Sequence, residues 1–569
     1  MFFYKCLLVL DLIAMPLLMA RASAEVEVIL KDDMPLHCQM NTDNTTYIIR
    51  LDFDLNGDTL NIPFHSILKF EGGGLNNGTI VGDNSIINAK KTRIFTDVRV
   101  CGFWANANVY SDWFDFSKAN NDFEMQSLFG LAKGESLTHL YLKDQSYYIS
   151  SCNIASNEFG NILIPSNTHV HNDGIIKILT TGARQNYPIY LKNVENVTIE
   201  GGKIDGQIEN YQGIPNGQTQ FYGIHCRASK NITIKNVRIS GVWGGGVSMQ
   251  LLPNTGIHNE NIIIDNVVVE NNGGSGFTIE DGINVQVKNC LSQNNGNRGF
   301  WTVCSSYHIE PSYEMAAVEN LLILHSKSIN SLRTFTVSLG KIKEYSEIKI
   351  DEVEGDGPIV MNNLNGNSTI SINKCKYSDL NSFYHFRNVI LTNCKMGKIY
   401  VKSGCDNVSF RRCQISVQEE QGDGALCVLG KSSIRFENCS IESTVKTINA
   451  NECEFTFKKC DINCTSSACV LAGTMDKCRV QYKKEIRLYN YSGTGTTTLT
   501  NCELIVENSG ETYGQNHGMI TLYSPQGKYS IVNTTIKCYK RIESPIRSYA
   551  SNCSLRQNNL QIKTINNPW

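Results

Sequence analysis

A phrase of nine residues repeats along most of the chain, and this repeat constrains the fold more than any other feature. Each copy alternates apolar and polar residues, breaks at a polar corner and resumes with a second short alternating run. Alternation with a period of two is typical of β-strands, and self-similarity every few tens of residues is typical of a solenoid. The copies are NVTIEGGKI at Asn196, NITIKNVRI at Asn231, NIIIDNVVV at Asn261, NVQVKNCLS at Asn284, NLLILHSKS at Asn320, EIKIDEVEG at Glu347, TISINKCKY at Thr369, NVILTNCKM at Asn388, NVSFRRCQI at Asn407, SIRFENCSI at Ser433, EFTFKKCDI at Glu454, TTTLTNCEL at Thr496 and KYSIVNTTI at Lys528.

A repeat of this length with two or three short strands corresponds to one turn of a parallel β-helix. We therefore predict an all-β, right-handed parallel β-helix solenoid, since parallel crossovers are almost always right-handed. A solenoid can grow as one elongated unit, so the 569 residues do not require several globular domains. We expect 137–569 to form the β-helix and 25–136 to form an N-terminal cap with early coils.

One short amphipathic helix is predicted inside that cap, roughly from Asn121 to Lys133. Its apolar anchors are Phe123, Leu128, Phe129 and Leu131. A helix at this place would cover the open end of the β-helix, where unpaired strand edges promote aggregation.

Residues 1–24 resemble a signal peptide. Lys5 precedes an apolar stretch from Cys6 to Met19, and Ala22-Ser23-Ala24 fits a cleavage site of small residues. The apolar stretch is too short to span a bilayer. We expect cleavage before Glu25 and a soluble periplasmic or extracellular protein.

Cysteines recur at the seventh place of the repeat, which indicates an inward stack rather than a disulfide framework. Val237 and Val267 take the same place in other copies. A denser group could instead hold a disulfide or a metal ion, but zinc spacing is absent and we interpret it as structural. The stacked cysteines are Cys290, Cys375, Cys394, Cys413, Cys439, Cys460 and Cys502; the denser group is Cys453, Cys460, Cys464, Cys469 and Cys478.

The formal net charge of −2 and the 19% of charged residues include no block of Lys or Arg. This pattern argues against nucleic acid as a partner and against binding to an anionic membrane surface. It gives no indication of the oligomeric state.

Several segments resemble pectate-lyase-superfamily (pectin lyase-like) β-helix proteins. The run from Trp113 (WFDF) through the predicted helix to YLKDQSYYI is similar to their opening motif, in which a tryptophan–phenylalanine pair and an Asp-rich turn precede a helix. GGGLNNGTIVGDNSIINA and SSYHIEPS are similar to segments of exported Bacteroides-type β-helix proteins related to polygalacturonases. The resemblance implies the right-handed β-helix fold and a polysaccharide partner.

The chain departs from that family at its activity motifs. The polygalacturonase signatures G-D-D, G-H-G and R-I-K are absent. Where an acid-bearing G-W-G-D-G-type turn would be expected, the chain has Val242-Trp243-Gly244-Gly245-Gly246. The resemblance therefore supports the fold more strongly than any activity.

A second strand precedes each copy of the phrase, and these strands can be aligned by their spacing. Their second and fourth residues should face away from the core and, on parallel strands about 4.8 Å apart, form two columns. Such a polar row is a plausible polysaccharide groove. One column is Tyr190, His225, Ser248, Thr278 and His308; the other is Lys192, Arg227, Gln250, Glu280 and Glu310.

Three aromatic residues, Tyr222, Trp243 and Trp301, lie a few residues before these strands. Flat rings beside a polar groove suit the C–H faces of sugars. The same rings could simply pack loop against coil. With Lys192, Arg227, His225 and Gln250, we take the three rings as candidate substrate-binding residues.

Glu280 and Glu310 are the candidate catalytic carboxylates, with His308 as a group that tunes or replaces the acid. Hydrolysis of a glycosidic bond needs an acid and a second carboxylate about 5 to 9.5 Å away. Repulsion between neighbouring carboxylates raises one pKa and favours a proton-bearing acid. A glycoside hydrolase acting on an acidic or pectin-like glycan is thus one hypothesis, and it needs no cofactor.

Two alternatives remain open. A polysaccharide lyase would use Arg227 or Lys192 as base or uronate ligand and would hold Ca²⁺ through Glu280, Glu310 and Asp281. A catalytically inactive glycan-binding or structural solenoid is favoured by Gly245 and by the missing family signatures, because a fold alone implies no activity.

Overall fold

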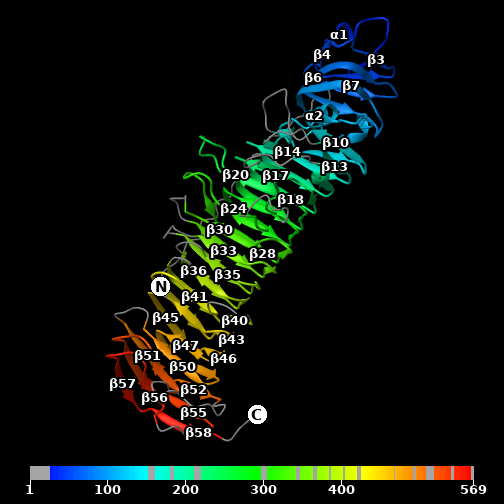
Figure 1. The fold of residues 1–569 in the computed structure, drawn as a ribbon. Coiled ribbons are helices and arrows are strands. Elements are labelled where there is room, and N and C mark those ends of the chain that lie inside the picture. Colours follow the sequence, from blue (N-terminus) through cyan, green and yellow to red (C-terminus); the bar gives the residue numbers. More distant parts are fainter. Residues whose placement is uncertain are drawn as a thin grey trace, which may run out of the picture.

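The computed structural model describes residues 26–150, 160–179, 185–210, 220–296, 304–340, 346–362, 368–382, 386–401, 404–418, 424–450, 452–466, 468–490, 495–507, 518–539 and 544–565. The expected signal peptide and Trp301 lie outside these ranges. The described chain forms a long stack of parallel strands, with the N-terminal strands at one end and the C-terminal strands at the other (Figure 1).

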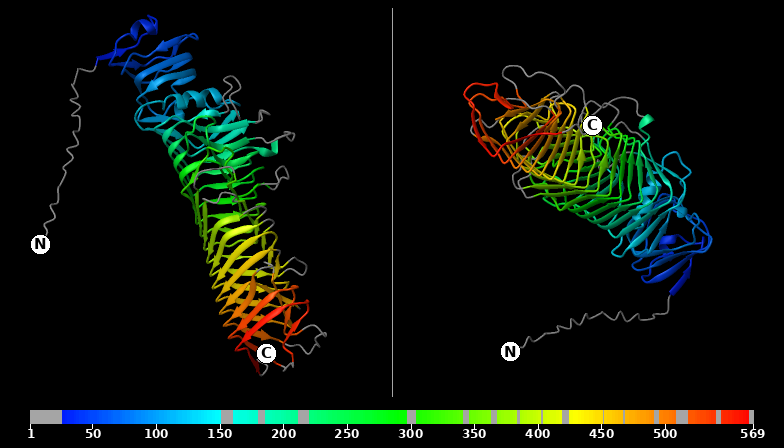
Figure 2. Two further views of the ribbon diagram at one scale, coloured as in Figure 1. Left: turned by 90° about the vertical axis from the view of Figure 1, so that its left-hand side faces the viewer. Right: turned by 90° about the horizontal axis from the view of Figure 1, so that it is seen from below.

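The copies of the nine-residue phrase fold as two strands joined at a corner, and the strand that precedes each copy completes the coil. The copy at Thr369 differs, because its second half forms only isolated β-bridges through Lys376. Pairing between coils is parallel and in register: Ile232 pairs with Ile262, and Ile239 pairs with Val269. The predicted all-β parallel solenoid is therefore confirmed. Two further views show the coils following one another along the stack from the N-terminal to the C-terminal end (Figure 2).

The first half of each phrase contributes to one sheet, which we call the long sheet. Its strands are β8 (Asn108–Tyr110), β9 (Thr138–Leu142), β12 (Thr168–Asn172), β15 (Glu195–Glu200), β18 (Lys230–Lys235), β21 (Glu260–Asp265), β24 (Gly282–Lys288), β27 (Val318–Glu319), β28 (Leu321–Leu324), β31 (Glu347–Asp351), β34 (Thr369–Asn373), β36 (Phe386–Thr392), β39 (Cys405–Arg411), β42 (Ser432–Glu437), β45 (Cys453–Lys458), β48 (Thr474–Asp476), β51 (Thr496–Thr500), β54 (Lys528–Val532) and β57 (Ser554–Asn558).

The second halves of the other copies lie in shorter strands that pair in two consecutive runs. The first run is β10 (Ser146–Ser150), β13 (Ile175–Leu179), β16 (Lys203–Asp205), β19 (Arg238–Ser240), β22 (Val268–Glu270), β25 (Leu291–Gln293), β29 (Lys327–Ile329) and β32 (Glu354–Gly355). The second is β37 (Lys395–Met396), β40 (Gln414–Val417), β43 (Ser440–Ser443), β46 (Asp461–Cys464), β49 (Arg479–Tyr482), β52 (Glu503–Val506), β55 (Thr535–Cys538) and β58 (Gln561–Thr564).

The strands that precede the phrase form a third sheet, which we call the site sheet. Its strands are β11 (Gly160–Leu163), β14 (Gln185–Lys192), β17 (Gln220–Arg227), β20 (Gly245–Gln250), β23 (Phe277–Ile279), β26 (Tyr307–Ile309), β30 (Phe335–Ser338), β33 (Ile359–Asn362), β35 (Leu380–Ser382), β38 (Ile399–Val401), β41 (Leu426–Val428) and β44 (Ile448–Ala450). A further run comprises β47 (Ala468–Ala472), β50 (Glu485–Tyr489), β53 (Ile520–Leu522) and β56 (Ile546–Ser548).

The N-terminal region is a smaller sheet with two helices. Its strands are β1 (Val26–Ile29), β2 (Thr45–Ile49), β3 (Phe53–Asp54), β4 (Thr59–Asn61), β5 (Ile67–Phe70), β6 (Leu75–Asn88) and β7 (Phe95–Trp104); the helices are α1 (Leu36–Gln39) and α2 (Asp122–Gly130), with 3₁₀ turns η1 (Ser111–Trp113) and η2 (Ile208–Asn210) elsewhere.

Helix α2 confirms that a helix lies near 121–133, but the predicted amphipathic division is wrong, since Glu124 and Ser127 are buried and Phe123 is partly exposed. The helix contacts β10 and β11 of the first coils on one side and β7 on the other (Figure 1). The helix thus covers the first coils as expected, but the N-terminal sheet rather than solvent lies beyond it. Among the described residues, no helix has the length and apolar character needed to cross a membrane.

Asparagines at the start of the phrase form a ladder up one edge of the long sheet. Asn261 has a φ of 56°, in the left-handed region that asparagine tolerates. Its Nδ2 donates to Oδ1 of Asn231 at 3.1 Å, and Nδ2 of Asn284 donates to its own Oδ1 at 3.1 Å. The asparagine ladder consists of Asn167, Asn196, Asn231, Asn261, Asn284 and Asn320.

The seventh-place cysteines are buried in the core, as predicted. Cys413, for example, is 2% exposed, and its Sγ donates to the backbone carbonyl of Arg411 at 3.4 Å. All cysteines of the described residues, including the denser group, are free thiols. The uninterrupted run, which we call the cysteine ladder, is Cys375, Cys394, Cys413, Cys439, Cys460, Cys478 and Cys502.

Candidate functional site

The two predicted columns exist on the site sheet, and their register is as aligned from the sequence. His225 pairs with Tyr190 on one side and with Ser248 on the other, and Thr278 pairs with His308. In the second column, Arg227 pairs with Lys192 and with Gln250. The repeat therefore brings the candidate residues together on adjacent coils.

The expected exposure is wrong for most of these columns, including Tyr190 at one end, which is 3% exposed. His225 is fully buried, Gln250 is 1% exposed and Glu280 is 8% exposed. The rings of Tyr187 and Tyr222 cover His225, and the segment that follows β26 contacts Glu280. Ser312 donates a hydrogen bond from Oγ to Oε2 of Glu280. Strand alternation predicts which side a residue faces but not what covers that side.

A chain of hydrogen bonds links the second column. Nη2 of Arg227 donates to Oε1 of Gln250 at 2.5 Å, and Nε2 of Gln250 donates to Oε1 of Glu280 at 2.5 Å. With Ser312 on Oε2, both carboxyl oxygens of Glu280 accept hydrogen bonds. Lys192, at the end of the column, is exposed to solvent.

Burial raises the pKa of Glu280 above its ordinary value, even though the hydrogen bonds from Ser312 and Gln250 oppose this rise. The nearby carboxylate of Glu310 raises the pKa of Glu280 further. A carboxyl group in a dry environment favours its protonated form, which is the form a general acid needs.

Glu310 lies on the next coil in a different environment. Its side chain is 42% exposed, and Oε2 lies 2.7 Å from Nε2 of His308. Nδ1 of His308 lies 3.2 Å from Oγ of Ser275. The face therefore holds one buried and one solvent-accessible carboxyl group on adjacent strands, whose spacing is about 4.8 Å.

The aromatic residues are arranged differently from the prediction. Tyr222 does lie on this face, and its ring covers Gly245: a Cβ atom at 245 would meet Cδ1 and Cε1 of Tyr222 at 3.0 Å. Trp243 is 5% exposed and belongs to the hydrophobic core, so its ring packs inside the coil and cannot stack on a sugar. Trp301 lies outside the described residues.

Sequence reasoning missed Tyr187. Its ring stacks on the imidazole of His225, with ring centroids 3.9 Å apart and an interplanar angle of 14°. The ring of Tyr222 also stacks on this imidazole, with a centroid distance of 5.6 Å and an interplanar angle of 10°. Arg227 lies over the Tyr187 ring at 5.5 Å. The signal was available, since Tyr187 precedes Tyr190 by three residues just as Tyr222 precedes His225.

His225 is one of the buried polar groups on this face whose side chain lacks a hydrogen-bond partner among the described residues. Neither ring nitrogen has a hydrogen-bond partner among the described residues. Burial lowers its pKa well below the usual range, and the Arg227 guanidinium adds to this effect. The imidazole is therefore neutral at physiological pH and retains one donor and one acceptor for a ligand.

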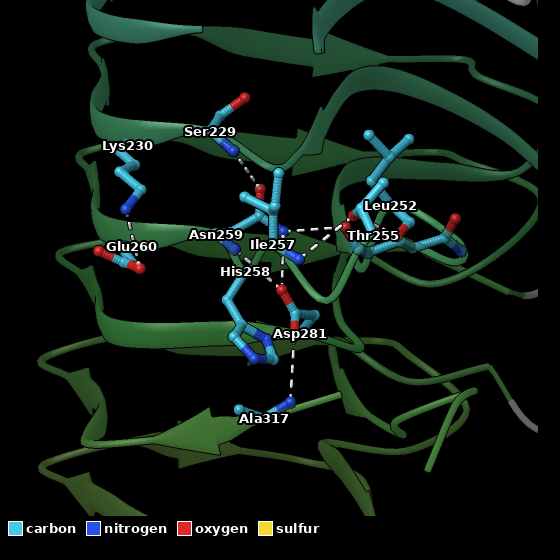
Figure 3. A network of polar contacts seen from close by, with 11 residues as sticks. Ser229, Lys230, Leu252, Thr255, Ile257, His258, Asn259, Glu260, Asp281 and Ala317 are labelled. Atoms are coloured by element: carbon cyan, nitrogen blue, oxygen red, sulfur yellow. Dashed lines mark hydrogen bonds and ion pairs between the residues drawn. The ribbon is translucent and has the colours of Figure 1, made fainter. Parts of the chain in front are cut away.

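Asp281 directly follows Glu280, and it anchors the strand end (Figure 3). Its Oδ1 lies 2.7 Å from Nδ1 of His258 and accepts from the backbone N–H of Ala317 at 3.0 Å. Its Oδ2 accepts from the backbone and side-chain N–H groups of Asn259 at 2.9 and 3.2 Å. Both oxygens are thus engaged by nitrogen groups, which removes Asp281 from the calcium ligands that the lyase hypothesis assigned to it.

Solved structures similar to this chain are distant. Bacteriophage phi29 gene product 12 is 14% identical, with 75% of this chain and 70% of that chain covered and a TM-score of 0.38. The A-module of a mannuronan C-5 epimerase from Azotobacter vinelandii is 12% identical, with 80% and 100% covered and a TM-score of 0.32. The tailspike protein of Escherichia coli bacteriophage HK620, solved with a pentasaccharide, is 10% identical, with 75% and 74% covered and a TM-score of 0.35. These likenesses carry no inference about activity.

Comparison with the curated proteins finds no match. Residues 138–312 match the family model described as "Right handed beta helix region". The matched coils include every described candidate residue of the site sheet, from Tyr187 to Glu310. Together with the parallel, in-register pairing of the coils, this match confirms the predicted fold: the chain is a right-handed parallel β-helix.

Proposed function

We propose that the protein binds an acidic polysaccharide along the site sheet and hydrolyses it with Glu280 as general acid and Glu310 as the second carboxylate. The observation that carries the proposal is the contrast between the two carboxyl groups. Burial raises the pKa of Glu280, whereas Glu310 on the adjacent coil is open to solvent and paired with His308. Two carboxyl groups in opposite environments are the usual arrangement for dividing acid and base roles.

The remaining side chains fit substrate binding. Arg227 and the exposed Lys192 supply positive charge for an acidic glycan beside the carboxyl pair. His225 is fully buried between the rings of Tyr187 and Tyr222, so its free donor and acceptor can reach a sugar hydroxyl only when the substrate parts these rings. A substrate reaching Glu280 must displace Ser312 from Oε2, so the segment 310–317 controls access to the acid.

Export belongs to the same proposal. The apolar stretch before Ala22-Ser23-Ala24 has the pattern of a cleaved signal peptide. The likeness of the GGGLNNGTIVGDNSIINA segment to exported polygalacturonase-related proteins of Bacteroides-type bacteria supports a periplasmic or extracellular site of action on such a glycan.

A glycan-binding role without catalysis is the second candidate. It is favoured by the hydrogen bonding of Glu280, both of whose oxygens already have donors, and by its 8% exposure. In that case the Arg227–Gln250–Glu280–Ser312 chain would serve to order the binding face.

The test is an assay of the purified protein on a polysaccharide panel, with new reducing ends and absorbance of unsaturated uronates read together, with and without EDTA. The hydrolase proposal predicts reducing ends without that absorbance. Glu280→Gln and Glu310→Gln should each lower the rate about 10²- to 10⁴-fold, the usual contribution of a positioned acid or base, while glycan binding is retained. Glu260→Gln, on the long sheet and paired with Lys230, is the matched control and should keep full activity.

The other outcomes distinguish the alternatives. Binding without turnover on any glycan contradicts hydrolysis and supports the binding role. Uronate absorbance that disappears when EDTA is added contradicts hydrolysis and supports a calcium-dependent lyase. The calcium ligands of that lyase would have to exclude Asp281. Turnover that survives both carboxyl substitutions would move the active site away from this face.

A further inference from the structure

Three histidines gather on the outer face of the long sheet, away from the site sheet. His139 lies on β9, and His169 and His171 lie on the adjacent strand β12. His139 pairs directly with His169 across the two strands, and His171 is diagonal to it. Each side chain is partly exposed to solvent. This cluster has no role in the face that carries Glu280 and Glu310.

Their ring nitrogens are close enough to share one ion. One ligand nitrogen from each histidine can be chosen so that all three lie within 4.8 Å of one another. Nδ1 of His139 lies 3.0 Å from Nε2 of His171. A tetrahedral Zn²⁺ with Zn–N bonds of about 2.0–2.1 Å places its nitrogens about 3.3 Å apart. The nitrogens must therefore approach one another by up to about 1.5 Å, which requires the rings to rotate.

The surroundings of the cluster resemble those of bound metal ions. Oε2 of Glu200 lies 3.0 Å from Nε2 of His169, and Nζ of Lys235 holds the same carboxylate at 2.9 Å. A carboxylate on the second nitrogen of a metal-binding histidine fixes the ring and raises its basicity. This contact leaves Nδ1 of His169 for an ion. The ring of Tyr141 stacks on the ring of His171, with centroids 4.7 Å apart and an interplanar angle of 9°. This contact limits the orientations of the His171 ring.

The protonation state suits coordination, because a metal ion binds only neutral imidazole. Burial is the main factor that lowers the pKa of His169 and of His171 below the usual range. His139 lowers the pKa of both histidines further and His169 adds to the shift at His171, whereas Glu200 opposes the shift at both.

We propose that His139, His169 and His171 bind one divalent transition-metal ion of the class that prefers imidazole, such as Zn²⁺, with solvent completing the coordination. The rings of His169 and His171, now stacked at 3.8 Å, turn about their Cβ–Cγ bonds to point their lone pairs at the ion. The ion joins β9 to β12 and stabilises the first coils of the β-helix. This proposal is independent of the glycan-binding function.

The test uses Zn²⁺ itself as the probe. The purified protein is stripped with EDTA, kept reduced, and titrated by isothermal calorimetry, with thermal unfolding measured in parallel. The wild type should bind one equivalent of Zn²⁺. The His171→Ala and His139→Ala variants should each lose this binding or show an affinity at least about 100-fold lower. Glu200→Gln should keep the equivalent with affinity reduced about 10- to 100-fold. Zn²⁺ should raise the unfolding temperature of the wild type, since a ligand of the folded state stabilises it, and not that of the histidine variants.

Matched controls make the result interpretable. His325→Ala changes an exposed histidine that is ion-paired with Glu352 on the same sheet, and it should bind Zn²⁺ like the wild type. The exposed thiol of Cys38 is present in every variant, so its contribution cancels in the difference. Circular dichroism confirms that each variant is folded. Equal stoichiometry and affinity in the wild type, His139→Ala and His171→Ala would overturn the proposal, as would a wild type that binds no Zn²⁺ at micromolar concentrations.

Discussion

Gln250 donates from Nε2 to Oε1 of Glu280 at 2.5 Å, and its own Oε1 accepts from Arg227. Because a guanidinium has donors only, the amide can be placed in one orientation, with its NH₂ group toward the carboxyl group. Gln250 therefore separates the positive charge of Arg227 from Glu280 by one side chain. A direct ion pair would hold Glu280 ionised, whereas this arrangement is compatible with a proton-bearing acid.

Glu280→Gln is expected to change the pH dependence of stability. The pKa of Glu280 is higher in the folded state than in the unfolded chain, where it is about 4.3. As pH rises from the unfolded value through the folded value, the folded state must give up a proton that it binds more tightly, so the wild type loses stability. The neutral glutamine avoids this loss. The unfolding temperature of the variant minus that of the wild type should therefore be larger at pH 8 than at pH 4.

Thermal unfolding followed by circular dichroism across this pH range checks the expectation. Glu260→Gln, a surface carboxylate paired with Lys230, serves as the control for general effects of charge removal. A difference that stays constant between pH 4 and pH 8 would contradict a raised pKa at Glu280.

Asp281→Ala is expected to destabilise the protein strongly. The substitution leaves the N–H groups of Asn259 and Ala317 without their buried acceptor. Removing one partner of a buried charged network costs about 3–5 kcal/mol in the free energy of unfolding. Asp265→Asn, which alters a partly exposed residue paired with Lys288, should cost at most about 1 kcal/mol. Urea unfolding of both variants measures the difference, and similar losses would show that the Asp281 contacts contribute little.

The asparagine ladder can be tested at Asn261, where backbone conformation and hydrogen bonding are separable. Alanine at a φ of 56° is strained, whereas glycine adopts this conformation freely. Both substitutions remove the bonds to Asn231 and Asn284. Asn261→Ala should therefore be less stable than Asn261→Gly by about 1–2 kcal/mol. Equal stability of the two variants in urea unfolding would indicate that the ladder bonds, not the backbone conformation, select asparagine.

The buried cysteines are expected to resist thiol reagents. Burial raises the pKa of Cys290 to about 12, and the cysteine ladder is equally hidden from solvent. Since the thiolate is the reactive species, a chromogenic disulfide reagent should react quickly with the exposed Cys38, more slowly with the partly exposed Cys101 and Cys553, and with the ladder only after unfolding. Cys38→Ser should abolish the fast phase. Rapid reaction of several further thiols in the native protein, or a thiol count that rises on reduction, would contradict this arrangement.

Much of the fold could be predicted because each coil repeats the same local pattern. The period-two alternation identified the strands, and the common spacing to the phrase gave the correct pairing of His225 with Ser248 and of Thr278 with His308. Parallel in-register stacking turns sequence alignment directly into spatial adjacency. The cysteine positions followed for the same reason, because one place in the repeat always faces the core.

Burial of the site could not be predicted in the same way. The segment 310–317 lies outside the repeat, and its contact with Glu280 through Ser312 depends on a loop path that no periodicity describes. Trp243 illustrates the same limit, since a ring in a corner can turn into the core or out of it. The histidine cluster was missed although THL at Thr138 and THVH at Thr168 begin like copies of the phrase.

The Asp281 contacts have a consequence for how the rod opens. In a solenoid each coil contacts only its neighbours, so fraying starts at the two ends and proceeds coil by coil. Ser229 donates its backbone N–H to Oδ1 of Asn259, Asn259 binds Asp281, and Asp281 accepts from Ala317, which ties four successive coils through side chains as well as strands. An opening front that arrives from either end must break this tie before it exposes the coils of Glu280. The terminal coils of the β-helix can therefore unfold locally while the coils around Glu280 stay folded.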